Sequence, residues 1–152
     1  MAPRIALIQG ANMEYLGQRQ PEFYGTTTAE ELDSMCNSRA SSLGLELDIY
    51  YSNLEGEAIG HLYELKRDRL DGIVMNPAGF LYAGSALADC LLAVNVPYVE
   101  VHMTNIEARG KTSVTAPVCT GMITGLGVTS YTLALDAIAN LIADGQTTLT
   151  KN

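Results

Sequence analysis

A loop near the start of the chain holds residue types that proton-transfer chemistry needs. The segment Gln9–Gly25 reads QGANMEYLGQRQPEFYG and carries Asn12, Arg19 and Tyr24. A phenol is a poor base at neutral pH because its ordinary pKa is about 10, but a guanidinium within about 4–6 Å favours the ionised form of an acidic group. We therefore expect Tyr24 to act as a base beside Arg19. The alternative is that Tyr24 packs on the following helix and Arg19 is a solvated loop residue.

A second pair of candidate catalytic residues occurs in the sequence VEVH. Glu100 and His102 are two residues apart at the end of an apolar run, so in a strand their side chains share one face. A carboxylate beside an imidazole fixes its tautomer and favours the imidazolium, which makes His102 a candidate general acid. A histidine that is satisfied by a backbone carbonyl is the alternative. The other histidine, His61, lies in a mixed helical segment and is expected at the surface.

The composition argues against several other kinds of site. There are 17 acidic and 9 basic residues, which give a net charge of -8, and no basic stripe indicates a nucleic-acid partner. A small anionic substrate stays compatible if positive potential is concentrated locally. Cys36, Cys90 and Cys119 are odd in number and form no CxxC pair, so we expect reduced packing residues. Two histidines without matching cysteines or clustered carboxylates predict no metal site, and the glycines of segment 121–127 lack dinucleotide-binding spacing, so we expect no cofactor.

The length of the chain, 152 residues, fits one domain, expected over residues 1–145, followed by a polar, frayed tail over 146–152. No run of about 18 apolar residues occurs, and the start MAPRIALIQG has no leader pattern. We therefore expect no membrane partner and a cytoplasmic location.

Short apolar runs alternate along the chain with segments of helical periodicity. The expected strands are Arg4–Ile8, Leu45–Tyr51, Gly72–Met75, Tyr98–Val101 and Met122–Leu126. The expected helices run from Thr27 or Thr28 to Gly44, from Asn53 to Arg69, from Gly84 to Ala93 and from Val128 to Ile142. This alternation predicts the α/β class, as a flavodoxin-like three-layer sandwich with a five-stranded parallel sheet in the order 2-1-3-4-5.

In such a sheet, ligands bind beyond the carboxyl ends of the strands. Asn12, Asn76, Glu100 and His102 all fall at those ends in the predicted sheet. The loop from Gly10 to Thr26 holds 17 residues, whereas such connections usually have about two to six. We therefore expect this loop to be a lid or a binding loop over the site.

The candidate residues lie within longer motifs that cover almost the whole chain. In order, these motifs are IALIQGANMEYLGQRQPEFYGTTTAEEL, YSNLEGEAIGHLYE, DGIVMNPAGF, VPYVEVHMTNIEAR and TAPVCTGMITGLGVTSYTLALDAI. They resemble those of type II 3-dehydroquinate dehydratases, small flavodoxin-like enzymes that eliminate water from a cyclic keto acid in the shikimate and quinate pathways. The resemblance implies a hydro-lyase that acts by anti elimination on a carboxylated keto acid and needs no cofactor.

The resemblance also implies catalytic roles. Tyr24 matches the family's lid tyrosine, which is the base, and Arg19 matches the arginine that favours its ionised form. Asn12 matches the asparagine that helps to hold the water stabilising the enolate. His102 matches the general acid, and Glu100 matches the residue that orients it.

Further matched residues are implied to bind the substrate or a second subunit. Asn76, together with backbone groups of Met103 and Thr104, matches the groups that bind the carboxylate and the tertiary hydroxyl region. Members of the family typically form trimers that assemble into dodecamers. Asp89 matches an aspartate that reaches the site of a neighbouring subunit, so a homo-oligomer is implied.

The chain departs from the family pattern on one side of the site. After the NP motif the family usually reads GAYTH, whereas this chain reads AGFLY, so Tyr82 replaces a substrate-binding histidine. Ala88 stands where an arginine is usual. After Arg109 the chain has GKTS in place of EEFRHHS, so about three residues and a second substrate-binding arginine are missing. Lys111 is a partial substitute, because a flexible ammonium does not reproduce a bidentate guanidinium fork.

These departures leave the proton-transfer residues complete. We therefore expect an enolate-forming elimination with altered recognition of the ring diol. The alternatives are an isomerase or another lyase that uses the same tyrosine and histidine on a different carboxylated substrate, and a non-catalytic ligand-binding paralogue.

Overall fold

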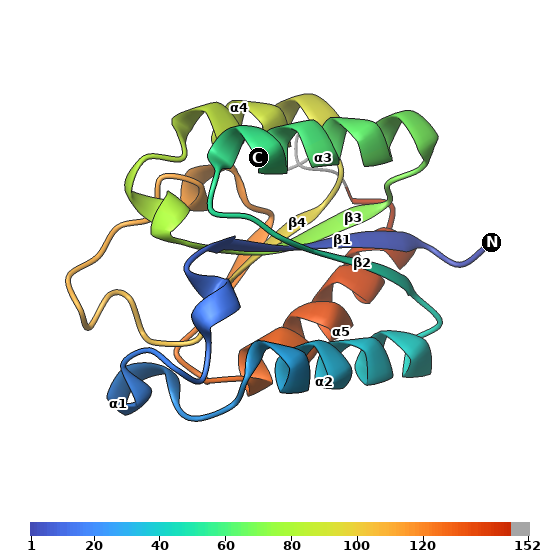
Figure 1. The fold of residues 1–152 in the computed structure, drawn as a ribbon. Helices are drawn as coiled ribbons and strands as arrows, with labels where there is room; N and C mark the ends of the chain where they lie inside the picture. The colour runs from blue at the N-terminus through green and yellow to red at the C-terminus, as the bar shows by residue number, and fades with distance from the viewer. Residues whose placement is uncertain (147–152) are drawn as a thin grey trace.

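The computed structural model, described over residues 1–146, has a central sheet between two layers of helices (Figure 1). The five strands are parallel and lie in the order β2-β1-β3-β4-β5. They are β1 Arg4–Ala11, β2 Glu46–Tyr51, β3 Gly72–Ala78, β4 Tyr98–His102 and β5 Gly121–Thr124. The predicted fold class and strand order are confirmed. The predicted tail 146–152 lies, apart from Gln146, outside the described residues.

Two helices cover each face of the sheet. Figure 1 shows α2 (Ala29–Ser42) and α5 (Thr129–Ala143) on one face and α3 (Glu55–Asp68) and α4 (Ser85–Val94) on the other. Helix α2 begins where its sequence predicts, because the Thr28 side chain accepts from the Glu31 amide while the Glu31 side chain accepts from the Thr28 amide. Shorter helical pieces are α1 Pro21–Tyr24, η1 Met13–Tyr15, η2 Gly79–Tyr82 and η3 Ala116–Val118.

Burial on both faces explains the continuous apolar runs of the central strands. Leu7 and Val74 belong to the core beneath α2 and α5, whereas the next residues along each strand, Ile8 and Met75, belong to the core beneath α3 and α4. Strand β5 ends at Thr124 rather than at Leu126 as predicted, because Gly125 adopts a φ of +90° and turns the chain.

The carboxyl ends of β1 and β3 approach each other closely. A side chain at Gly10 would place its Cβ 2.0 Å from the Pro77 carbonyl oxygen, so only glycine fits there. Ala78, at the end of β3, has a φ of +46°, which is unfavourable for a residue with a Cβ. This close approach places the residues that follow both strands at one edge of the sheet.

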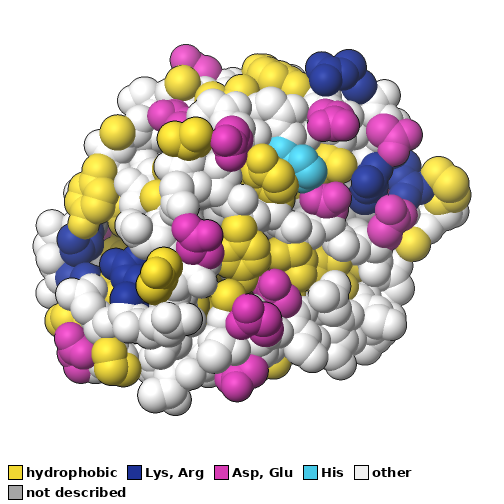
Figure 2. Space-filling view, in the orientation of Figure 1, with side chains coloured by type: hydrophobic (Ala, Val, Ile, Leu, Met, Phe, Trp, Pro, Cys, Tyr) yellow, Lys and Arg dark blue, Asp and Glu magenta, His cyan; other side chains and the backbone are white. Residues whose placement is uncertain are grey.

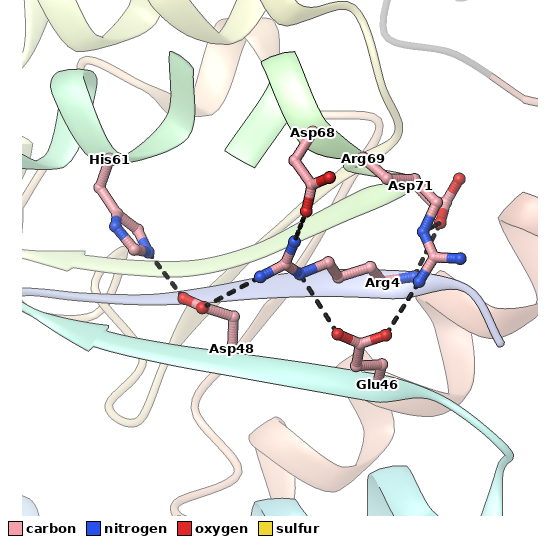
Figure 3. A network of polar contacts seen from close by, with 7 residues as sticks. All are labelled: Arg4, Glu46, Asp48, His61, Asp68, Arg69 and Asp71. Atoms are coloured by element: carbon pink, nitrogen blue, oxygen red, sulfur yellow. Dashed lines mark hydrogen bonds and ion pairs between the residues drawn. The ribbon is translucent and has the colours of Figure 1, made fainter. Parts of the chain in front are cut away.

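The amino ends of the strands carry a network of paired charges, which we call the amino-end network. It comprises Arg4, Glu46, Asp48, His61, Asp68, Arg69 and Asp71 (Figure 3). The prediction that His61 is a surface residue is wrong in part. Its side chain is only 19% exposed, its Nε2 lies 2.6 Å from Asp48 Oδ1, and its ring stacks on Tyr50. Strand β2 lies at the edge of the sheet, and His61 of α3 covers part of it by contacting Asp48 and Tyr50.

The three cysteines are buried, as the prediction of packing residues requires. Cys36, Cys90 and Cys119 are free and buried, and burial raises the pKa of the Cys36 thiol to about 12. No helix within residues 1–146 is long and apolar enough to cross a membrane.

Candidate active site

The long loop after β1 brings Tyr24 over the carboxyl end of the sheet. The residue lies at the end of α1, a single turn that begins at Pro21 and ends before Gly25, whose φ is +74°. The Arg19 guanidinium lies over the Tyr24 ring, with its carbon 4.8 Å from the ring centroid. The segment predicted as a lid therefore brings its own arginine and tyrosine together.

The hydroxyl of Tyr24 contacts a second arginine from a different part of the chain. Arg109 Nη1 donates to Tyr24 Oη at 3.2 Å and to Thr104 Oγ1 at 2.9 Å. The same guanidinium lies 4.8 Å from the centroid of the Phe23 ring. Arg109 thus joins α1 to the loop after β4. This contact is not predictable from the sequence, because 85 positions separate Arg109 from Tyr24 and no local spacing connects them.

A cavity of about 640 Å³, including its open mouth, lies between α1, the carboxyl ends of the strands and the loop after β4. Nine of the predicted site residues line it: Asn12, Arg19, Tyr24, Asn76, Tyr82, His102, Met103, Thr104 and Lys111. Two do not. Glu100 lies behind His102, and Asp89 is exposed on α4, away from this cavity.

His102 and Glu100 form a buried pair at the end of β4. His102 Nε2 lies 2.8 Å from Glu100 Oε2, and the two residues are 3% and 0% exposed. The alternative of a histidine held by a backbone carbonyl through this nitrogen is therefore wrong. Because Nε2 faces the carboxylate, Nδ1 is the ring nitrogen left for the cavity.

The Glu100 carboxylate accepts further hydrogen bonds from two hydroxyl groups. Tyr98 Oη donates to Oε1 at 2.6 Å, and Thr115 Oγ1 donates to the same oxygen. Burial tends to raise the pKa of this carboxyl, but the hydrogen bonds from its three neighbours outweigh burial and lower the pKa below its ordinary value. The site therefore contains a buried carboxylate that is ionised at neutral pH.

The side chain of Asn76 is held from within the protein. Its Oδ1 accepts from the Ala78 amide at 2.9 Å, and its Nδ2 donates to Tyr131 Oη at 2.8 Å. Tyr131 in turn donates to Gln9 Oε1 at 2.7 Å. Because burial raises the pKa of Tyr131, this phenol stays neutral and keeps its proton for that bond. Asn76 therefore has a fixed orientation at the floor of the cavity.

Tyr82 and Lys111 form the rim opposite α1. The Lys111 ammonium is hydrogen-bonded to the Tyr82 hydroxyl and lies 4.8 Å from the centroid of its ring. Tyr82 is 64% exposed, so it borders the mouth of the cavity rather than filling its interior. The loop that carries Lys111 is anchored to η2, because the Val114 amide donates to the Leu81 carbonyl at 3.1 Å.

The three cations that line the cavity, Arg19, Arg109 and Lys111, take no part in the ion pairs found among the described residues. Figure 2 shows dark blue Lys and Arg side chains at the left, on the side of α1 and the loop after β4, and others at the right and upper right, where magenta Asp and Glu side chains lie beside them. The chain as a whole has a net charge of -8. Positive potential is therefore concentrated at the cavity, as an anionic ligand requires. No group of three or more His, Cys, Asp or Glu in the described part of the chain is arranged to hold a metal ion.

The chain is similar to known proteins of one family over most of its length. Residues 3–139 match the family model described as Dehydroquinase class II. The chain is 44% identical over 145 residues to a 3-dehydroquinate dehydratase of Halothermothrix orenii, a match that covers 93% of this chain and 97% of the relative. A 3-dehydroquinate dehydratase of Thermus thermophilus is 38% identical over 144 residues, with the same two coverages.

Solved structures give the same result. A type II dehydroquinase from Propionibacterium acnes superposes with a TM-score of 0.85 at 35% identity, over 92% of this chain and 98% of that one. A 3-dehydroquinate dehydratase-like protein from Bifidobacterium longum superposes with a TM-score of 0.69 at 30% identity, over 93% and 98% of the two chains.

Proposed function

Because the chain belongs to the class II dehydroquinase family, we propose that it is a hydro-lyase that eliminates water from 3-dehydroquinate or a closely related cyclic keto acid. The single observation that carries this function is the pairing, in one cavity, of a phenol contacted by two guanidinium groups with an imidazole backed by a buried carboxylate. The first is suited to accept a proton, and the second is suited to donate one.

The first step is removal of a proton from the carbon next to the ketone. Tyr24, as the phenolate, accepts this proton, and the C–H electron pair forms the enolate. Arg109 donates to the Tyr24 hydroxyl and Arg19 lies over the Tyr24 ring, so both guanidinium groups place positive charge around this side chain. Asn12 and a bound water stabilise the enolate oxygen. Gly79 lies beside this part of the cavity, where a Cβ would come within 2.8 Å of the Ala11 Cβ.

The second step expels the hydroxyl group. The enolate re-forms the ketone and a carbon–carbon double bond, while the carbon–oxygen bond breaks and His102 gives its proton to the departing oxygen. Water leaves, Tyr24 carries one extra proton, and His102 lacks one, so exchange with solvent restores both groups. The buried Glu100 carboxylate holds His102 through Nε2 and stabilises its protonated form. We assign binding of the substrate carboxylate to Asn76, Met103 and Thr104, which line the cavity.

Steady-state turnover tests this function, because the conjugated product absorbs in the ultraviolet and the substrate does not. We expect Tyr24→Phe and His102→Ala each to lower kcat by at least about a hundredfold. The single variants also separate the steps. His102→Ala should still exchange the proton next to the ketone with deuterated solvent, and Tyr24→Phe should not. Normal turnover by both variants would contradict the proposal.

We further propose that recognition of the ring diol differs from that of most relatives. Tyr82 and Lys111 occupy the rim where the family pattern has a histidine and an arginine, and they are hydrogen-bonded to each other. An ammonium already held by a phenol is a weaker partner for two neighbouring hydroxyls than a free guanidinium fork. We expect dehydroquinate to show a raised KM and Tyr82→His to lower it several-fold. Tyr82→Phe is the matched control, because it frees Lys111 without adding an imidazole. An unchanged KM in Tyr82→His would contradict the proposal.

We also propose that the enzyme is a homo-oligomer in which Asp89 acts on a neighbouring site. Asp89 is exposed on α4 and does not line the cavity of its own chain, so any role in catalysis requires a second copy. Light scattering should give a trimer or a multiple of it, and mixing Asp89→Ala with inactive Tyr24→Phe chains should restore part of the activity. A fully active monomer would contradict this.

A further inference from the structure

A layer of buried hydroxyl groups lies behind the Glu100–His102 pair. Tyr98 and Thr115 both donate to Glu100 Oε1, and His102 is bonded to the other carboxylate oxygen. All four residues are buried, and Glu100, Tyr98 and Thr115 are fully buried. The polar contacts that the structure gives this carboxylate therefore all come from three side chains.

The direction of these hydrogen bonds is determined by counting protons. Thr115 has one hydroxyl hydrogen, and an ionised carboxylate only accepts, so that hydrogen lies toward Glu100. Ser113 Oγ lies 3.2 Å from Thr115 Oγ1 and must supply the hydrogen of that contact. Ser113 therefore donates to Thr115, and Thr115 donates to Glu100. The loop that carries Arg109 and Lys111 thus also contacts the buried Glu100 carboxylate through Thr115.

A carboxylate removed from water stays ionised only when donors replace its hydration. Without the two hydroxyls, Glu100 would have His102 as its one polar partner and would take up a proton more readily. A protonated Glu100 would no longer stabilise the imidazolium, and its O–H would compete for Nε2. The ring would then lose both its charge partner and its fixed orientation toward the cavity.

We propose that Tyr98 and Thr115 are positioning residues for the dehydration, which hold Glu100 in one orientation as a carboxylate and thereby keep His102 aligned as the acid. This inference rests on the proposed function. Neither residue lines the cavity, so neither touches the substrate. Tyr98 lies at the start of β4 and Thr115 at the end of the following loop, so strand and loop hold the carboxylate from two sides.

Kinetics of hydroxyl-deletion variants test the proposal. Tyr98→Phe and Thr115→Val each remove one donor with little change of shape, and we expect each to lower kcat about tenfold while KM changes less than about twofold. Thr115→Ser keeps the hydroxyl and should retain kcat within about twofold. The matched control is Tyr51→Phe, which removes another tyrosine–carboxylate hydrogen bond, Tyr51 Oη to Asp33 Oδ1 at 2.7 Å, away from the cavity. It should leave kcat unchanged.

Two further readouts separate positioning from general destabilisation. In Tyr98→Phe and Thr115→Val, the acid limb of the dependence of kcat on pH should move to higher pH. A carboxylate with fewer hydrogen-bond donors takes up a proton at a higher pH. The titratable groups that act on Glu100 are His102 and Tyr98, and Cys119 acts on Tyr98. In a Glu100→Gln background, Thr115→Val should cause no further loss, because both changes act through the same carboxylate.

Imidazole nitrogen NMR gives a readout that does not depend on turnover. The chain has two histidines, and His61, paired with Asp48, is an internal reference. Thr115→Val should shift the His102 signals and leave those of His61 in place. Unchanged His102 signals would overturn the proposal even if the wild-type chain proved inactive as a dehydratase. In an active wild type, normal kcat in both variants, or an equal loss in the Glu100→Gln background, would also overturn it.

Discussion

Among the described residues, arginine side chains are paired with carboxylates at the amino ends of the strands but not at the carboxyl ends. At the amino ends, the guanidinium groups of Arg4 and Arg69 are surrounded by carboxylates, and Arg4 lies 2.6 Å from Asp68 (Figure 3). At the carboxyl ends, the cations that line the cavity bind aromatic rings and hydroxyl groups instead. The same chemical groups are therefore neutralised at one end and left uncompensated at the other.

This difference has a physical reason. Paired charges at a surface cancel each other's field and contribute little to stability, typically about 0–1 kcal/mol per pair. Unpaired cations beside a cavity keep their field, which attracts an anionic substrate and stabilises negative charge that develops during the reaction. In a chain with a net charge of -8, such a positive region requires that acidic residues be kept away from it. The unpaired cations therefore mark the carboxyl end of the sheet as the functional end, whereas the paired charges at the amino end largely cancel one another.

The largest expected difference between the two ends of the sheet is in the effect of removing one guanidinium group on kcat/KM. Arg109→Gln should lower kcat/KM by about a hundredfold, because it removes the contact with the Tyr24 hydroxyl and a charge that favours the phenolate. Arg69→Gln removes the same charge from the amino-end network and should change kcat/KM less than about twofold. Steady-state assays of both variants, with thermal unfolding to check folding, measure the difference. Equal losses would abolish the distinction between the two ends.

A smaller effect is expected from salt. Because the screening length falls from about 30 Å at 0.01 M salt to about 10 Å at 0.1 M, kcat/KM of the wild type should fall several-fold over that range. Lys111→Gln should reduce both kcat/KM and its dependence on salt. Lys66→Gln changes the net charge equally but lies on the exposed end of α3, and it should behave as the wild type. If Lys66→Gln flattened the salt dependence to the same extent, net charge rather than the cavity would be responsible.

The buried Glu100 carboxylate gives stability a dependence on pH. Its pKa lies below the ordinary value of 4.5, so the unfolded chain takes up this proton before the folded chain does. The resulting stability is fully present above about pH 4.5 and is lost as the pH falls through the lower folded value. Glu100→Gln should lack this component, so the free energies of unfolding of the two proteins should converge on acidification. A constant difference from neutral pH to about pH 3 would show that the hydrogen bonds do not favour the ionised form.

The smallest expected effect concerns the backbone at the floor of the site. Ala78 has a φ of +46°, and glycine adopts such a conformation without a Cβ clash. Ala78→Gly should therefore raise the free energy of unfolding by about 1 kcal/mol while leaving kcat nearly unchanged. Gly10→Ala is the opposite case, since its Cβ would meet the Pro77 carbonyl oxygen at 2.0 Å, and it should be strongly destabilising. Denaturant unfolding measures both, and a loss of stability in Ala78→Gly would contradict the strain argument.

Local sequence patterns were sufficient for the elements and for pairs of residues that are close in sequence. The capping box at Thr28 placed the start of α2 correctly, because both of its hydrogen bonds are made within one turn. The alternation in VEVH placed Glu100 and His102 on one face, because strand geometry has a period of two. The interpretation of Arg19 and Tyr24 as partners also held, since only five positions separate them and the guanidinium lies over the ring.

Contacts between distant segments could not be found in this way. The partner of the Tyr24 hydroxyl is Arg109, and the donors to Glu100 include Thr115 from the following loop. Nothing in the spacing of these residues connects them, because parallel strands joined by helices bring their carboxyl ends together from positions far apart in the chain.

By itself the sequence determined the α/β sandwich, its strand order and which residue types were available for proton transfer, since these depend on periodicity, caps and extended motifs. Only the tertiary structure decided which arginine touches the phenol, which hydroxyls hold the buried carboxylate and which cations stay unpaired. Those outcomes depend on where loops from different strand ends meet, and the energy of a charge depends on the groups packed around it rather than on its neighbours along the chain.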